Sequence, residues 1–258
     1  MSLVPPKNAW RFSAEEMRFP ASVVHSNIRL EDERELRSKG SKFIANMGVA
    51  LKLPAAVIAT AQVFMHRFFQ RESFKTHKYH DVCGAAVYLA TKVEETGRRL
   101  RQVITIAAQK ALKNDAHKVE ENSKEFKNWW DTIMYYEELL LDVLCWEVNI
   151  DYPYEWILRL CKLFGAPQPI KESAWALAND SYRYPFCLQF SSQEIATACV
   201  VTAFLLAEGH DSDPSRIFVY CSTFGMSWER VMEVVEGLVG EVHEREVKMR
   251  LAIVVEKV

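Results

Sequence analysis

The stretch that decides the fold runs from residue 82 to residue 93 and reads Val82-Cys83-Gly84-Ala85-Ala86-Val87-Tyr88-Leu89-Ala90-Thr91-Lys92-Val93. Its apolar residues recur at i, i+3, i+4, i+7, i+8 and i+11, which is the spacing of one face of an α-helix. Much of that face is alanine, and small side chains let neighbouring helices approach closely. The pattern predicts a helix over 79–94 at the centre of a helical domain.

Four more helical patterns flank this stretch. They predict helices over 31–51, from Pro54 onward, after Gly97 and over 124–146. Pro54 suits a first helical turn because its ring fixes φ and its missing N–H is not needed there. The polar stretch 114–122 predicts a loop. Residues 31–150 are therefore predicted to form a domain of five helices.

The second half repeats this organisation, with helices predicted near 153–164, 171–182, 191–207, 214–223 and 227–248. The third of these carries Ala203-Phe204-Leu205-Leu206-Ala207, which repeats the Ala-x-x-Leu-Ala of Ala86 to Ala90. Pro153 disfavours helix at Tyr152 and can begin a new helix, so the domain boundary is placed at 149–153. We therefore predict an all-α chain with two five-helix domains, 31–150 and 151–258. An N-terminal extension, 1–30, contains a short helix that begins at Ser13.

Composition limits the function classes. The chain has 258 residues, of which 49% are hydrophobic and 26% charged, and its net charge is -2. This charge argues against nucleic acid as a direct partner, because domains that bind it are usually basic. No apolar run approaches the roughly 20 residues of a membrane span, so we expect no membrane partner. The six cysteines form no Cys-x-x-Cys pair, which is typical of a reducing compartment.

Glu137 breaks the apolar pattern of the helix predicted over 124–146. The apolar residues of that helix form one stripe: Trp130, Ile133, Met134, Leu140, Leu141 and Leu144. At about 100° per residue, Glu137 projects near the middle of this stripe. Burying an unpaired carboxylate costs roughly several kcal/mol, so Glu137 needs a partner, and Lys92, at the edge of the apolar stripe of the 79–94 helix, is the candidate. The pair is either an internal salt bridge or a polar anchor within a contact surface.

Three segments taken together resemble the cyclin family: Phe64-Met65-His66-Arg67-Phe68-Phe69, Tyr88-Leu89-Ala90-Thr91-Lys92-Val93-Glu94-Glu95 and Tyr136-Glu137-Glu138-Leu139-Leu140-Leu141-Asp142-Val143-Leu144. Their order and spacing are similar to those of a cyclin box. The resemblance covers about residues 10 to 258 and is closer up to 153. It implies two tandem five-helix cyclin folds, an N-terminal cyclin box over 31–150 and a C-terminal cyclin-like domain over 151–258. It also implies no catalytic activity, no cofactor, and a role in binding and activating a cyclin-dependent kinase.

The resemblance assigns a kinase-binding role to six residues. Lys92 and Glu137 match the pair that, in cyclins, grips the backbone of the kinase segment leading into its αC helix. An ammonium can donate to carbonyls, and a carboxylate can accept from amides. Four apolar residues fall where cyclins pack side chains against the αC helix itself: Val93, Leu141, Trp146 and Val148.

Among cyclins, the chain is most similar to the transcriptional group, namely cyclin T, cyclin K and the cyclin subunit of fungal kinases that act on the RNA polymerase II C-terminal domain. The residues that support this are Trp10-Arg11-Phe12, Ser73-Phe74, and Lys92 to Glu95 followed by Arg98-Arg99-Leu100. The substrate-docking Met-Arg-Ala-Ile-Leu patch of cell-cycle cyclins aligns with Leu36-Arg37-Ser38-Lys39-Gly40, which has lost its apolar character. The resemblance thus implies a nuclear heterodimer with a kinase, the polymerase C-terminal domain as the substrate of the complex, and room for a further regulatory subunit. Cyclin L, which acts in splicing-linked transcription, is a near neighbour and stays an alternative.

Two smaller clusters have competing interpretations. Arg98, Arg99 and Arg101 gather at a predicted helix start, where cations oppose the helix dipole. They are either a solvated loop or a docking patch for an acidic or phosphorylated partner. His77, His80 and Cys83 have a metal-like spacing, but no fourth ligand is evident and we predict no metal site.

Two other function classes compete with a kinase regulator. A DNA-binding general transcription factor can also contain two cyclin folds, but such factors tend to be basic and often carry a zinc ribbon. An all-helical enzyme is the other alternative, and no catalytic triad, phosphate loop or cysteine-nucleophile signature supports it.

Overall fold

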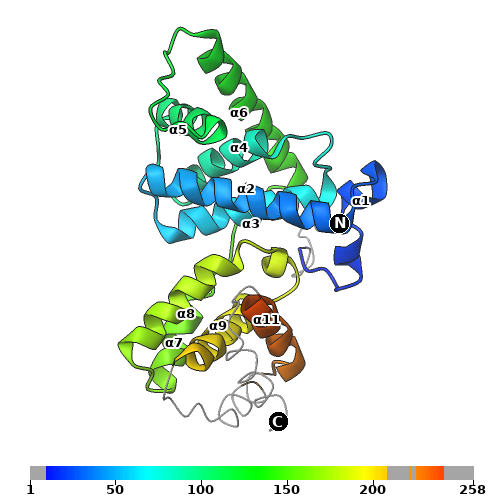
Figure 1. Ribbon diagram of the computed structural model, residues 1–258, viewed down its shortest axis with the longest axis vertical. Coiled ribbons are helices and arrows are strands. Elements are labelled where there is room, and N and C mark those ends of the chain that lie inside the picture. Colours follow the sequence, from blue (N-terminus) through cyan, green and yellow to red (C-terminus); the bar gives the residue numbers. More distant parts are fainter. Residues whose placement is uncertain (1–9, 208–220, 222–224, 241–258) are drawn as a thin grey trace, which may run out of the picture. The chain divides into compact units, whose positions relative to one another are not determined.

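The computed structural model describes residues 10–207, 221 and 225–240 (Figure 1). Its described part is helical and contains no strand, which confirms the predicted all-α class. Contacts between Cα atoms divide the chain into two compact units. The first comprises Met1–Ile150 and Tyr182–Gln189, and the second comprises Asp151–Ser181 and Phe190–Val258.

The five longest described helices of the first unit are α2 (Leu30–Ala50), α3 (Ala55–Arg71), α4 (Tyr79–Val93), α5 (Leu100–Leu112) and α6 (Lys124–Val143). The central helix is α4, which contacts each of the other four (Figure 1). Its predicted apolar face is buried from Val82 to Ala90, and Val93 at its end is partly buried. The alanine-rich periodicity therefore does place a helix at the centre of this domain.

The N-terminal segment contains a 3-10 turn, η1 (Glu16–Arg18), and a short helix, α1 (Ala21–Ser26). The predicted capping pair is present: Ser13 Oγ accepts from the amide of Glu16 at 3.2 Å, and the Glu16 carboxylate accepts from the amide of Ser13 at 2.7 Å. The 3-10 turn η1 that follows has Glu15 as its N-cap and lasts only three residues, and α1 was not predicted. Helix α1 is held by tertiary contacts, since Ser22 Oγ accepts from the amide of Phe74 at 3.0 Å.

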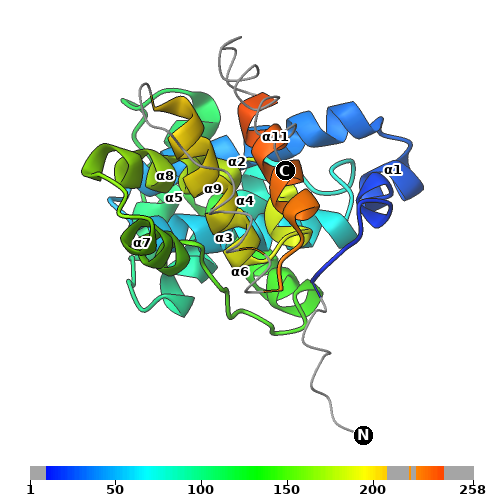
Figure 2. The ribbon, with the colours of Figure 1, turned by 90° about the horizontal axis from the view of Figure 1, so that it is seen from below.

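The described helices of the second unit are α7 (Tyr154–Leu163), α8 (Gln168–Ser181), α9 (Ser192–Leu206) and α11 (Trp228–Gly240). Figure 1 and Figure 2 both show α7 and α8 beside α9, and α9 also contacts α11. A capping box between Ser191 and Glu194 begins α9, and Arg230 Nε donates to the same glutamate at 2.6 Å. Apart from Cys221, the helix predicted over 214–223 lies outside the described residues.

The segment Tyr182–Gln189 belongs to the first unit although it lies within the region predicted as the second domain. It contains a 3-10 turn, η2 (Pro185–Leu188). Ser41 Oγ and His66 Nε2 both donate to the carbonyl of Tyr182 at 2.9 Å. The amide of Phe12 donates to the carbonyl of Leu188 at 2.8 Å. These backbone acceptors explain why the segment packs with helices α2 and α3.

A buried polar cluster lies between α2 and α3. Arg37 is almost fully buried, and it donates to the carboxylate of Glu33 at 2.5 Å, to the carbonyl of His66 at 2.8 Å and to Gln70 Oε1 at 3.2 Å. The charge is therefore compensated by one carboxylate and two neutral acceptors, as burial of a guanidinium requires. In the described part of the chain, no helix is long and apolar enough to cross a bilayer.

Candidate partner-binding surface

Lys92 and Glu137 form a direct ion pair between α4 and α6. Lys92 Nζ lies 2.7 Å from Oε1 and 2.9 Å from Oε2 of Glu137. The Glu137 side chain is 9% exposed, whereas that of Lys92 is 46% exposed. The carboxylate therefore lies among buried residues of α6, and the ammonium reaches it from the solvent side.

Two neighbours hold the Lys92 ammonium in its charged form. Burial alone would lower the pKa of Lys92, but the hydrogen bond and the negative charge of Glu137 outweigh it, and the pKa is raised. The ammonium also lies 4.2 Å from the centre of the Tyr88 ring, which adds a cation–π contact. Lys92 has three donors, so donors remain available for carbonyl groups of another chain.

The apolar residues predicted to accompany this pair differ in exposure. Val93, Leu141 and Val148 are partly buried and pack against the core of the first unit. Trp146 is 68% exposed, which is unusual for so large an apolar side chain. Trp146 is therefore available for contact with a partner. The other three residues lie at the edge of the core and are partly exposed.

The turn that presents Trp146 is strained and is held by two arginines. Cys145 and Trp146 both adopt the left-handed conformation, with φ of 52° and 62°, at a cost of about 1–2 kcal/mol each. Arg71 Nη1 donates to the carbonyl of Val143 at 3.0 Å, and Arg67 Nη1 donates to that of Glu147 at 2.8 Å. These contacts fix the backbone on both sides of Trp146.

Sequence reasoning did not assign this role to Arg67 and Arg71. Both guanidinium groups also lie over the ring of Trp10, at 5.1 and 4.1 Å from its centre. Their spacing of four residues places them on one side of α3, and this was the available signal. The acceptors are backbone carbonyls of a distant turn, which sequence does not reveal.

The predicted apolar stripe of α6 is buried along only part of its width. Ile133, Leu140 and Leu144 are fully buried, and Glu137 lies among them as predicted. Trp130 and Met134, which belong to the same apolar stripe, are 43% and 41% exposed. These two residues of the stripe are therefore exposed in part to solvent.

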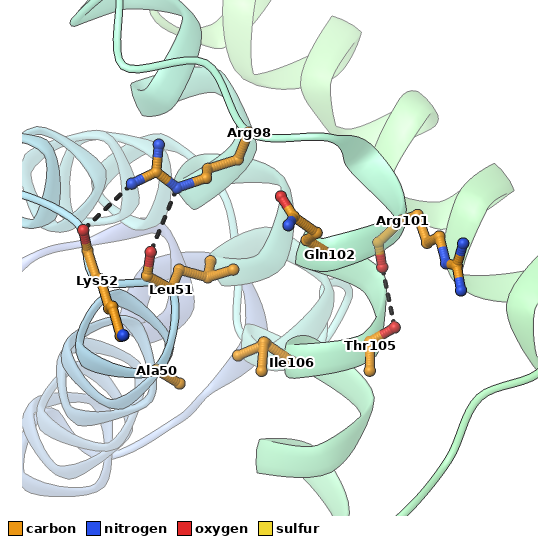
Figure 3. A pocket seen from close by; sticks show the side chains of 8 residues that line it. All are labelled: Ala50, Leu51, Lys52, Arg98, Arg101, Gln102, Thr105 and Ile106. Atoms are coloured by element: carbon orange, nitrogen blue, oxygen red, sulfur yellow. Dashed lines mark hydrogen bonds between the residues drawn. The ribbon is translucent and has the colours of Figure 1, made fainter.

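The three arginines near the start of α5 have different surroundings. Arg98 donates to the backbone carbonyls of Leu51 and Lys52 at 3.3 and 3.2 Å (Figure 3). It also donates to the carbonyls of Thr96 and Gly97 at 2.6 and 3.3 Å. Arg99 is the exposed N-cap residue of α5. Arg101 pairs with Glu121 at 2.7 Å. Arg98 thus stabilises the end of α2, and a docking role for all three together stays a prediction.

The metal-like spacing of His77, His80 and Cys83 does not produce a cluster. Within residues 10–207, 221 and 225–240, no three His, Cys, Asp or Glu side chains are grouped so that they could hold a metal ion. His77 instead lies 3.3 Å from Glu72 and 3.3 Å from the hydroxyl of Tyr136. Cys83 is buried, and burial raises its pKa well above the usual value.

Comparisons with known proteins give one family. The sequence profile described as "Cyclin, N-terminal domain" matches residues 10–149. Cyclin pch1 of Schizosaccharomyces pombe is 39% identical over 200 residues, which are 76% of this chain and 58% of pch1. Cyclin-T1-3 of Oryza sativa subsp. japonica is 32% identical over 198 residues, which are 76% of this chain and 40% of that protein. The chain thus spans about half the length of these relatives.

The fold has a counterpart among solved structures. A chain in the crystal structure of the yeast RNA Pol II CTD kinase CTDK-1 complex matches with a TM-score of 0.73 and 19% sequence identity. The match covers 89% of this chain and 72% of that one. At this identity the likeness concerns the fold, and it confirms the all-helical architecture.

Proposed function

Because the chain belongs to the cyclin family, we propose that it is the regulatory subunit of a transcriptional cyclin-dependent kinase. The kinase would phosphorylate the RNA polymerase II C-terminal domain in the nucleus and so control transcript elongation. Similarity to cyclin pch1 and to a plant cyclin T supports the transcriptional group. In this proposal the chain has no catalytic role of its own and acts by binding the kinase.

The observation that carries the proposal is the Lys92–Glu137 ion pair. A nearly buried carboxylate paired with a half-exposed ammonium is costly to maintain, and its net contribution to stability is small or unfavourable. The same two groups together offer a donor for carbonyls and an acceptor for amides at one point of the surface. The exposed Trp146 supplies an apolar anchor, and buried tryptophans often dominate the energy of interfaces.

The mechanism we propose is a shift in the conformation of the kinase. Lys92 and Glu137 would bind the backbone that leads into the αC helix, and Val93, Leu141, Trp146 and Val148 would pack against that helix. An active kinase requires an ion pair between the αC glutamate and the catalytic lysine. A partner that binds better to the αC-in state favours that state by its difference in affinity.

The first test compares two charge reversals on neighbouring residues of α6. We expect Glu137→Arg to abolish binding of the kinase, because it places a second cation beside Lys92. Glu138→Arg is the matched control, since Glu138 is exposed and has the same charge on the same helix. Co-purification with the kinase from a native extract measures binding, and circular dichroism measures whether each variant keeps its helices.

The second readout is phosphorylation of a peptide made of the polymerase heptad repeat. Activity that is present with the wild-type chain and with Glu138→Arg, and lost with Glu137→Arg, is the expected result. A bound kinase that does not phosphorylate the heptad would contradict the transcriptional assignment and favour a different pathway. Folded Glu137→Arg protein that still co-purifies at the wild-type yield would contradict the proposed surface.

A further inference from the structure

A hollow of about 380 Å³ lies between the end of α2 and the first turns of α5 (Figure 3). We call it the α2–α5 hollow. Its apolar lining comes from Ala50, Leu51 and Ile106. Its charged lining comes from Lys52, Arg98 and Arg101, and no acidic residue lines it. The volume is at the small end of the range for ligand pockets, about 300–1,000 Å³, and suits one large apolar side chain.

The cations around the hollow are held in place to different degrees. The Arg98 guanidinium is fixed by its bonds to the carbonyls of Leu51 and Lys52. Neutral carbonyls do not cancel its charge, so it contributes a fixed positive potential. Arg101 is paired with Glu121, but both side chains are more than half exposed, and water screens such a pair strongly. Lys52 forms no ion pair among the described residues.

The start of α5 adds to this potential. Its first turn contains no acidic residue, and its N-cap side chain makes no capping hydrogen bond. A helix N-terminus carries a partial positive charge that these groups would otherwise offset. The chain as a whole is negative, with a net charge of -2, so the α2–α5 hollow is a local exception.

We propose that the α2–α5 hollow docks a short acidic peptide segment of a partner protein, with one large apolar side chain inserted and flanking carboxylates on Lys52 and Arg98. Charge complementarity selects the acidic flanks, and the three apolar lining residues select the anchor. The hollow is built from the end of α2, the residues just before α5 and α5 itself. It shares no residue with the surface assigned to the kinase, so this docking goes beyond activation of the kinase.

The test measures binding of labelled nonapeptides to the full chain without any kinase, by fluorescence anisotropy. The probe peptide carries one phenylalanine flanked by glutamates. Replacing its phenylalanine with alanine, or its glutamates with lysines, should weaken binding at least about tenfold. Raising the salt from about 50 to about 200 mM should also weaken it, because exposed charges are screened over shorter distances. A single-stranded RNA of similar length serves as the competing probe.

Two glutamate substitutions at the end of α2 provide the variant and its control. Ala50→Glu places a carboxylate in the hollow and should weaken binding at least about tenfold. Val49→Glu adds the same charge one residue earlier, at a side chain that is 74% exposed and does not line the hollow, and should change affinity less than about threefold. Methyl resonances of Leu51 and Ile106 should shift on binding of the peptide.

Three results would overturn the proposal. In the first, the phenylalanine peptide shows no saturable binding up to about 1 mM. In the second, Ala50→Glu and Val49→Glu change the affinity for the peptide equally. In the third, the RNA binds more tightly than the peptide. Because no kinase is present, these outcomes do not depend on whether Glu137→Arg disrupts kinase binding.

Discussion

At the scale of single residues, the two halves of the Lys92–Glu137 pair do not have equal access to solvent. Glu137 is held among buried side chains of α6, whereas Lys92 reaches over the surface beside Tyr88. A purely structural salt bridge requires only opposite charges at short distance. A pair that also binds a partner backbone requires the ammonium and the carboxylate in these particular places.

Exchanging the two residues separates these roles. We expect Lys92→Glu combined with Glu137→Lys to restore most of the stability that either single change removes, because the internal attraction returns. Kinase binding should stay lost, since donor and acceptor have exchanged places. Chemical denaturation and co-purification measure the two effects, and recovery of both together would show that the pair has only an internal role.

His66 predicts a dependence of stability on pH. Burial and the charge of Arg37 lower its pKa from 6.5 to about 3, although the hydrogen bond to the carbonyl of Tyr182 opposes this. Between these pKa values the unfolded chain binds more protons than the folded chain. The free energy of unfolding should therefore fall as the pH drops below about 6.5, by at most about 1.4 kcal/mol per pH unit from this group.

Denaturant unfolding from about pH 7.5 to about pH 5 measures this slope, and His66→Gln should reduce it. The variant keeps the nearby ion pair between Glu33 and Arg37, so the change in the pH slope of the free energy of unfolding reports on the imidazole of His66. An NMR titration in which His66 takes up a proton near pH 6.5 would contradict the expectation.

The residue scale also shows what sequence can predict. Periodicity placed Glu137 among apolar residues and Lys92 at the edge of another helix's apolar stripe, because each inference uses only the geometry of a single helix. The role of Arg98 was not predictable, since its acceptors depend on a turn in which Lys52 has a φ of 52°. Likewise, the bonds of Arg67 and Arg71 depend on the left-handed turn at Cys145 and Trp146.

At the scale of elements, α2 and α3 approach closely at Gly48. A Cβ atom on Gly48 would lie 2.4 Å from Cγ1 and 2.6 Å from Cδ1 of Ile58, which is far inside van der Waals contact. Only a glycine permits this crossing without a shift of Ile58.

Gly48→Ala should destabilise the chain by about 1–3 kcal/mol, the usual cost of overpacking. Ile58→Ala should lower the free energy of unfolding less in the Gly48→Ala background than in the wild type, because it removes the clashing atoms. Gly97→Ala is the control, since nothing lies within 4 Å of its Cβ position and we expect little change. Denaturant midpoints for the four variants measure the coupling, and strictly additive effects would contradict the proposed clash.

The long helices were predictable because their apolar periodicity extends over three or more turns. The predicted range 79–94 corresponds to Tyr79–Val93 in the structure, and 31–51 corresponds to Leu30–Ala50. Helix α1 has six residues and no side-chain cap, so its sequence carries almost no local signal. Tertiary hydrogen bonds that Ser22 and Ser26 accept from Phe74 and Ser73 hold it instead.

At the scale of the whole molecule, the first unit is completed by a segment from later in the chain. Tyr182 and Leu188 supply carbonyls to donors on α2, on α3 and at Phe12. A fragment containing only residues 1–150 leaves these donors without acceptors. Each buried unsatisfied donor costs about 1–3 kcal/mol.

We therefore expect the 1–150 fragment to be less stable than the same residues in the intact chain. Hydrogen exchange of α3 measures this, and its protection should decrease in the fragment. A second chain keeps residues 182–189 but has a flexible linker in place of 151–181. This chain should recover much of the protection of α3 against hydrogen exchange. Equal exchange in the fragment and the intact chain would contradict the expectation.

The late position of Tyr182–Gln189 also affects how the protein is made. After Ile150 has been added, a ribosome must add thirty-nine more residues before the carbonyl acceptors of this segment are complete. At about 5–20 residues per second, this takes roughly 2–8 s. During that interval the nascent first unit holds Ser41 and His66 without their acceptor, so it is not yet a finished domain.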